Sequence, residues 1–153
     1  MANKVESADL ILKLYDLRRE DKMRKAREWF FTFNPQSADE YWATMMNPEV
    51  GAYARMVISY WDMAAAMVNH GAIDPELFNE TAGEHIMVYA KLEPILESLR
   101  ERFQNPNALK NLQKVIMDQP DGAQRVKQTQ EFMKTIREQM AAAQTGKADE
   151  AAA

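Results

Sequence analysis

The chain has 153 residues, of which 46% are hydrophobic and 27% charged, with a formal net charge of −4. Its length suits one domain with a substantial core, and its acidic balance excludes a global positive field that would attract nucleic acid or an anionic membrane. Because the sequence has no cysteine, disulfides, thiolate nucleophiles and Cys-ligated metals are excluded as well.

The composition favours helices throughout. Only five glycines and six prolines are present, and good helix formers are abundant. The first predicted helix is long: Ser7 is its expected N-cap, and Leu10 and Leu14 follow at helical spacing. It should run through a charged stretch into the aromatics of 29–33. We expect it to end before Pro35, because the residue preceding a proline avoids the α conformation.

A short helix and a long apolar helix are predicted next. Ser37, with Glu40 three residues later, matches the capping box and begins a helix that should end near Asn47-Pro48. Pro48 suits the first position of a helix that continues to residue 70. Besides one apolar stripe, this helix carries a second stripe that consists of Met56, Tyr60, Met63 and Met67. A helix that is apolar on most sides is buried on most sides, so we expect 48–70 to be central.

The segment 71–78 predicts a helix stop followed at once by a helix start. Gly71 can supply the left-handed residue that closes a helix, Asp74 is an N-cap, and Pro75 fits the first helical position. Ile73 should pack against Phe78 as a hydrophobic staple. Because these signals interrupt the helix, Asp74 does not share a helix face with the histidine four residues before it. We interpret the segment as a structural hinge rather than a metal or proton-transfer site.

The remaining chain predicts three more helical stretches. One runs over 75–104, with bends expected near Gly83 and Pro94, and the sequence alone does not decide whether it is continuous there. Another covers 106–117, and the last starts near Ala123 with a weaker apolar stripe.

We therefore expect an all-α, single-domain bundle of five or six helices around the central apolar helix. The bundle domain should span 1–143. The residues 144–153 are too polar and too few to bury anything, so we predict a disordered C-terminal tail.

Catalytic patterns do not stand out in the sequence. Glu80, Glu84 and His85 are the strongest candidate ligands, but neither a Glu-x-x-His nor a His-Glu-x-x-His pattern is present. A glycine-rich phosphate loop and a nucleophile elbow are missing too. We predict no catalytic, cofactor-binding or metal-binding residue, and we do not expect an enzyme.

The basic run at 18–27 is a further candidate site. Arg18, Lys22 and Lys25 would share one face of a continuous helix, next to the aromatics of 29–33, and could bind phosphates. Acidic residues are interspersed, however, and can pair with these cations at helical spacing. A solvated face beside a buried aromatic cluster is the alternative interpretation.

Several short motifs carry a family resemblance. They are Tyr53-Ala54-Arg55-Met56, the segment 70–78, Gly83, Tyr89 and the segment 92–96. With them, the chain over about 24–117 resembles a family of small bacterial helical proteins known only as a domain of unknown function. His70 is a departure, since the family usually has a basic residue there. The resemblance implies a compact helical domain in which 71–78 is a structural signature, and it implies no activity, cofactor or catalytic residue.

The sequence thus favours a non-enzymatic, cytoplasmic protein that forms a homo-oligomer or binds a protein partner through the face of Met56, Tyr60, Met63 and Met67. One alternative is a nucleic-acid or anionic-surface binder that uses the run 18–27. Another is a small-ligand pocket inside the bundle. A membrane association is not expected, because no apolar run is long enough to cross a bilayer.

Overall fold

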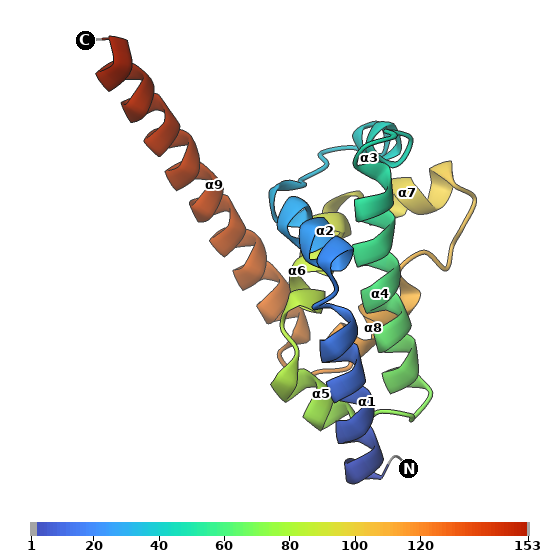
Figure 1. Ribbon diagram of the computed structural model, residues 1–153. Helices are drawn as coiled ribbons and strands as arrows, with labels where there is room; N and C mark the ends of the chain where they lie inside the picture. The colour runs from blue at the N-terminus through green and yellow to red at the C-terminus, as the bar shows by residue number, and fades with distance from the viewer. Residues whose placement is uncertain (1–2, 153) are drawn as a thin grey trace.

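The computed structural model describes residues 3–152, and within this range it consists of nine α-helices and one 3-10 turn, without strands (Figure 1). In chain order these are α1 (Lys4–Leu17), α2 (Asp21–Thr32), α3 (Ala38–Met45), α4 (Gly51–Asn69), α5 (Pro75–Thr81), α6 (Glu84–Leu92), η1 (Glu93–Ile95), α7 (Leu96–Arg102), α8 (Lys110–Met117) and α9 (Gly122–Ala152). The predicted all-α class is confirmed. The number of helices exceeds the five or six expected, because two of the predicted helices are interrupted.

The first interruption separates α1 from α2, where the sequence predicts one continuous helix. Glu20 causes the break, since its carboxylate accepts a hydrogen bond from the backbone amide of Met23 at 3.0 Å and thereby caps a new helix. The turn over 18–20 lets α2 leave the axis of α1 (Figure 1).

Ser7 is also not the N-cap of the first helix. Asn3 takes that position, with its side-chain oxygen 2.9 Å from the amide of Val5. Ser7 lies within α1 and is fully buried, and its hydroxyl oxygen accepts a hydrogen bond of 2.9 Å from the amide of Asp74. Its polar group therefore joins α1 to the turn before α5.

The predicted central position of the long apolar helix is confirmed. α4 packs against α2, α3, α5, α6 and α8. It starts at Gly51 rather than at Pro48, because the side-chain oxygen of Asn47 accepts hydrogen bonds from the amides of residues 49 and 50 and holds them in a turn. A Cβ atom on Gly51 would lie 2.4 Å from the Met45 carbonyl oxygen, so a side chain there would collide with α3.

The second interruption divides the run predicted over 75–104. α5 ends at Thr81, residues 82–83 are extended or irregular, and α6 begins at Glu84. At Pro94 the chain passes through the turn η1 into α7. The helix is therefore broken near Gly83 and continues at Pro94 with a 3-10 turn. The helix predicted to begin at Pro106 starts later, at Lys110, after Leu109 in a left-handed conformation.

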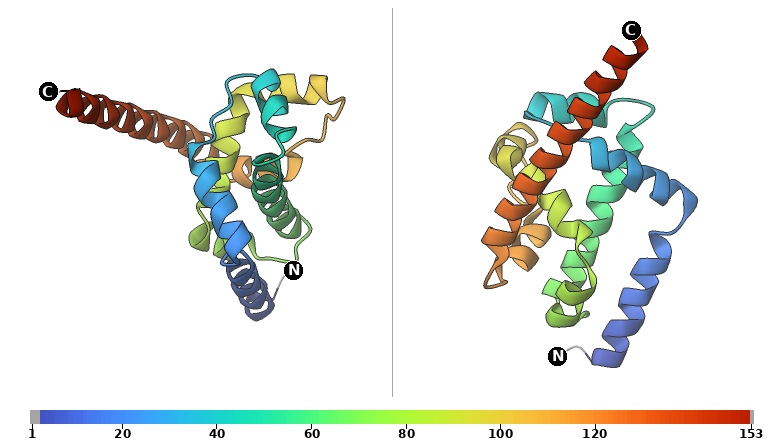
Figure 2. Two further views of the ribbon diagram at one scale, coloured as in Figure 1. Left: turned by 45° about the horizontal axis from the view of Figure 1, so that its top comes forward. Right: turned by 90° about the vertical axis from the view of Figure 1, so that its left-hand side faces the viewer.

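α9 is the longest element, and only its first part belongs to the bundle. It packs on α6 and α8, with Val126 and Met133 buried, and then leaves the body as an extended arm (Figures 1 and 2). The boundary predicted between a bundle over 1–143 and a tail over 144–153 falls inside this helix, which is drawn as far as Ala152. Disorder of the tail in solution stays a prediction, and residue 153 lies outside the described residues.

Among the helices described here, none combines the length and the apolarity that a crossing of the membrane requires.

Candidate functional site

The hinge residues build the corner between α4 and α5. Gly71 has a φ of +75°, and the Asp74 carboxylate accepts a hydrogen bond of 2.8 Å from the amide of Leu77 at the start of α5. Ile73 and Phe78 are both buried. This geometry satisfies backbone amides at a change of direction and buries both apolar side chains. A structural role for these residues stays a prediction.

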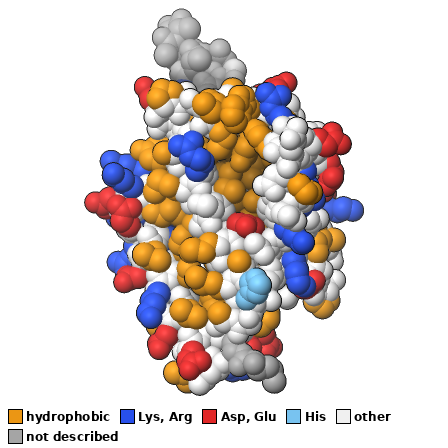
Figure 3. Space-filling view, turned by 90° about the vertical axis from the view of Figure 1, so that its right-hand side faces the viewer, with side chains coloured by type: hydrophobic (Ala, Val, Ile, Leu, Met, Phe, Trp, Pro, Cys, Tyr) orange, Lys and Arg blue, Asp and Glu red, His pale blue; other side chains and the backbone are white. Residues whose placement is uncertain are grey.

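The methionine stripe of α4 is partly covered by α1. Tyr60 donates a short hydrogen bond from its hydroxyl to the Leu14 carbonyl, and burial raises the pKa of this tyrosine to about 12. Met56 and Met67 are half-buried against the core, while Met63 remains 42% exposed. On the side of the molecule turned away from α9, hydrophobic side chains gather through the upper middle of the view, and most charged side chains lie around its edges (Figure 3). Met63 is thus the one exposed residue of the predicted interface, whose role in binding stays a prediction.

The structure does not bring Arg18, Lys22 and Lys25 onto one helix face. Arg18 follows the end of α1, where its guanidinium lies 4.7 Å from the centre of the Tyr15 ring and 5.9 Å from that of Trp61. Lys22 and Lys25 are exposed on α2, beyond the break. The continuous helix that would have aligned these cations is missing.

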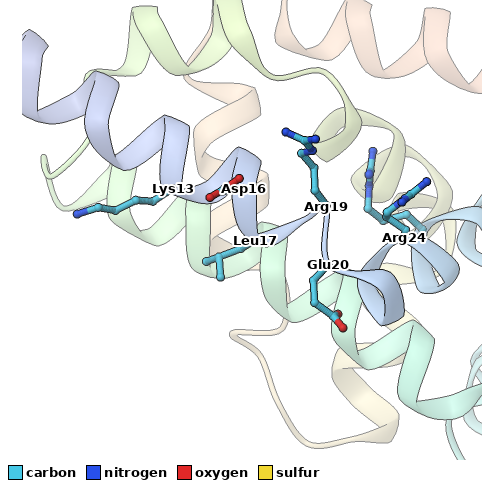
Figure 4. Close-up of a pocket in the computed structure, with 7 residues that line it drawn as sticks. Lys13, Asp16, Leu17, Arg19, Glu20 and Arg24 are labelled. Atoms are coloured by element: carbon cyan, nitrogen blue, oxygen red, sulfur yellow. The ribbon is translucent and has the colours of Figure 1, made fainter.

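An open hollow of about 910 Å³ lies at the junction of α1 and α2, and it involves other charged residues. It is lined by Lys13, Asp16, Leu17, Arg19, Glu20, Arg24 and Arg27. The two carboxylates of this hollow offset the charge of two of its four cations. The labelled side chains point in different directions (Figure 4). They do not converge on a common point as the ligands of a phosphate would.

Glu84 and His85, the candidate ligands from the sequence, are both enclosed by other side chains of the bundle. Glu84 accepts hydrogen bonds from Arg27 at 2.7 and 2.9 Å and from the indole nitrogen of Trp61 at 3.0 Å. His85 is fully buried beside the rings of Trp61 and Phe78, and neither of its ring nitrogens has a hydrogen-bond partner among the described residues. Burial, assisted by the charge of Arg125, lowers the pKa of His85 to about 4. Glu84 is thus engaged and His85 is sealed from solvent.

Metal-ligating side chains are not gathered elsewhere either. Over the residues that the structure describes, no three His, Asp or Glu side chains lie where they could hold one ion together.

A groove with a mostly apolar lining lies where α9 leaves the body. Its volume is about 470 Å³, and its walls come from the end of α2, from α6 and from α9. The apolar lining consists of Phe31, Met87, Phe132, Met133, Ile136 and Met140, with Ala141 beyond them. Phe31 is 49% exposed, Phe132 63% and Met140 47%. Large apolar side chains of α2 and α9 are thus left in contact with water on two walls of the groove, a pattern typical of binding surfaces.

Two cations lie in this groove, and they differ in their surroundings. Lys91 is buried, and its ammonium donates hydrogen bonds to the carbonyls of Phe30, Phe31 and Phe33 at 2.8, 2.6 and 2.8 Å. It therefore satisfies the carbonyls of Phe31 and Phe33, while the Phe30 carbonyl also accepts a hydrogen bond of 3.1 Å from the amide of Phe33. Burial, together with the nearby charge of Arg137, lowers the pKa of Lys91 to about 8. Arg137 is exposed and makes no side-chain hydrogen bond or ion pair with any residue in the described part.

The sequence pattern indicates the apolar residues of α9 in this groove but not the residues of α2 and α6 that lie with them. Thr129, Met133, Ile136 and Met140 recur at alternating spacings of four and three residues, which is a visible signal of a helix seam. The pairing of this seam with Phe31 and with α6 has no local signal, because these segments are far apart in the chain. It follows from the packing of α9 on α6 and from the hydrogen bonds by which Lys91 of α6 holds the end of α2.

The comparisons with known proteins give one match. Residues 4–118 match the family model described as Domain of unknown function (DUF4760). The matched part begins earlier than residue 24, where the resemblance in the sequence starts, and it contains α1 to α8, whereas α9 lies beyond it. Searches among curated proteins and among solved structures found no match.

Proposed function

The chain belongs to the DUF4760 family, a domain of unknown function, and for this member we propose a role as a non-enzymatic binding module. In this proposal the groove between α2, α6 and α9 holds a helix of a partner protein. The observation that carries the proposal is the apolar seam of α9. It continues at the same spacing from the part that is packed on the body to the part that is not.

The seam has two halves with different surroundings. Val126 and Met133 are 3% and 9% exposed, because they pack on the body. Ile136 is half-buried, and Met140 is 47% exposed at the rim. Alternating spacings of three and four residues are those by which two helices pack side by side. The exposed half of the seam thus has the pattern of a helix contact without a helix opposite it.

The apolar surface in the groove is large enough to contribute to binding. Burying an apolar side chain completely stabilises by about 1.5–3 kcal/mol, so the exposed halves of Phe31, Phe132 and Met140 represent roughly 1 kcal/mol each. Three methionines line the groove, and their flexible side chains can adapt to partners of different shape.

A bound helix would also support the arm itself. Beyond Met133 almost every described side chain of α9 is exposed, and an isolated helix of such length is marginally stable in water. Packing a second helix along the arm supplies the tertiary contacts that most helices in proteins depend on.

The non-enzymatic part of the proposal is supported by the surroundings of Glu84 and His85. The first is engaged by Arg27 and Trp61, and the second is fully buried away from any open cavity. The homo-oligomer, the cytoplasmic location and the bacterial origin expected from the sequence stay predictions. So does the use of the run 18–27 for anions, although the placement of Arg18 gives it no support.

A fluorescent probe in the groove tests the proposal. The chain has no cysteine, so Gln144→Cys at the rim of the groove can be labelled at one position with an environment-sensitive dye. The ligand is a synthetic amphipathic helix three heptads long, with leucine along its seam and equal numbers of Glu and Lys elsewhere.

We expect a saturable blue shift of the dye, because the bound helix would exclude water from the groove. The variant Met140→Glu should weaken it at least tenfold by placing a charge in the contact. The control carries the same dye at Lys127→Cys, an exposed position of α9 outside the groove lining, and should show no shift. An unchanged dye at position 144 would contradict the proposed function.

A further inference from the structure

The charges around the groove specify the partner more closely. We propose that the helix bound there is acidic: an amphipathic helix of another protein whose apolar seam is flanked by Asp or Glu carboxylates, at least one of which pairs with Arg137. This inference rests on the proposed function of the groove.

The charged part of the lining is entirely cationic. Lys91 and Arg137 are its charged residues, and no carboxylate belongs to the lining described above. On the adjoining flank of α9, a smaller hollow of about 330 Å³ adds Lys134 and one acid, Glu131. A helix lying in the groove therefore meets an excess of positive charge along α9.

Arg137 is the cation whose N–H donors are available for a hydrogen bond with a partner. The ammonium of Lys91 has three N–H groups, and three carbonyls of the α2 terminus already accept hydrogen bonds from them. The guanidinium of Arg137 has five N–H groups, none of which has an acceptor among the described residues. A planar guanidinium pairs best with a carboxylate, which can accept two parallel hydrogen bonds from it.

The same charges disfavour the segment 134–147 of a second copy as the occupant. The exposed part of the arm over 134–147 carries three cations, Lys134, Arg137 and Lys147, against one carboxylate, Glu138. If this segment of another copy lay in the groove, it would bring further positive charge to Lys91 and Arg137. Like charges held together in an apolar contact oppose binding, whereas an acidic helix removes this conflict.

Two synthetic helices with the same leucine seam test the inference on the full chain. In one, the positions that flank the seam are Glu, and in the other they are Lys. Binding is measured by fluorescence anisotropy of the labelled peptides at low and at physiological salt. We expect the Glu peptide to bind about tenfold or more tightly than the Lys peptide, with a preference that shrinks as salt rises.

A charge reversal in the protein should reverse the preference. With Arg137→Glu the Lys peptide should bind at least as well as the Glu peptide. The matched control, Lys127→Glu, changes the net charge of the chain equally on the same helix outside the groove and should keep the original preference. Circular dichroism of each variant verifies that it is folded.

The outcomes separate this inference from the proposed function. If both peptides bind alike and Arg137→Glu changes neither, the acidic partner is overturned and the binding groove stands. If neither peptide binds and light scattering gives a monomer, both are overturned. If the chain is a dimer that Met140→Glu converts to a monomer, the occupant is a second copy, and the acidic partner is overturned.

Discussion

The buried histidine gives a quantitative prediction for the pH dependence of stability. His85 is fully buried with a pKa lowered to about 4, whereas a histidine in the unfolded chain has a pKa near 6.5. Between these values the unfolded state binds one proton more than the folded state. The contribution of His85 to the free energy of unfolding is therefore constant above pH 6.5 and becomes less favourable as the pH falls towards 4.

The size of the loss follows from the difference between the two pKa values. One unit of pKa corresponds to about 1.4 kcal/mol, so His85 should lower the free energy of unfolding by about 3 kcal/mol between pH 7 and pH 4. His85→Leu replaces the imidazole with an apolar side chain of similar volume and removes the titrating group. The variant should therefore gain about 3 kcal/mol relative to the native chain over this range.

Urea unfolding followed by tryptophan fluorescence, at half-unit steps of pH, measures this difference directly. Carboxylates titrate in both proteins and cancel in the comparison. His70→Leu, at the exposed histidine that ends α4, is the matched control, and it should not reproduce the effect. If the difference between His85→Leu and the native chain stays constant from pH 7 to pH 4, the assigned burial of His85 is wrong.

Three further predictions concern single contacts. Lys91→Met should lower the free energy of unfolding by about 2–3 kcal/mol, since the carbonyls of Phe31 and Phe33 lose their only hydrogen bond among the described residues, and a melting temperature that does not fall would contradict this role. Glu84→Gln should lower the free energy of unfolding by about 1–2 kcal/mol, because it weakens a bidentate pair with Arg27. Asp118→Asn, in an exposed ion pair with Lys114, should lower it by less than about 0.5 kcal/mol. Urea unfolding measures both, and equal losses would contradict the difference. Gly71→Ala should cost about 1 kcal/mol by thermal melting through its positive φ alone, since no atom lies within 4 Å of the added Cβ, and a neutral result would argue against the left-handed turn.

The helical class and several helix ends could be predicted because their signals are local. Ser37 accepts a hydrogen bond from the amide of Glu40, as the capping box indicates. Asp74 and Pro75 begin α5 in the predicted way. Caps of this kind involve neighbours within a few residues, so the order of residues is enough to reveal them. The central position of α4 was readable too, because an apolar stripe on more than one side requires burial on more than one side.

The breaks within the longer helices were harder to read. Glu20 looks like one more charge in a helical surface, and only the folded chain shows that its side chain caps a new helix. Ser7 shows the converse case, in which a good capping residue lies inside a helix because its hydroxyl meets Asp74, a residue distant in sequence. Propensity and spacing cannot distinguish these cases, since the deciding partner belongs to another element.

The sequence by itself determined the chemistry available to this protein: helices, no thiols, few histidines, and an apolar seam with alternating spacings on its last helix. Tertiary structure alone decided which of these features meet. It sealed His85, engaged Glu84 with Arg27, covered part of the α4 stripe with α1, and placed Phe31 opposite Met140 across an open groove. The physical reason is that periodicity fixes which side chains share a face of one helix, whereas the packing of helices against one another fixes which faces remain without a partner.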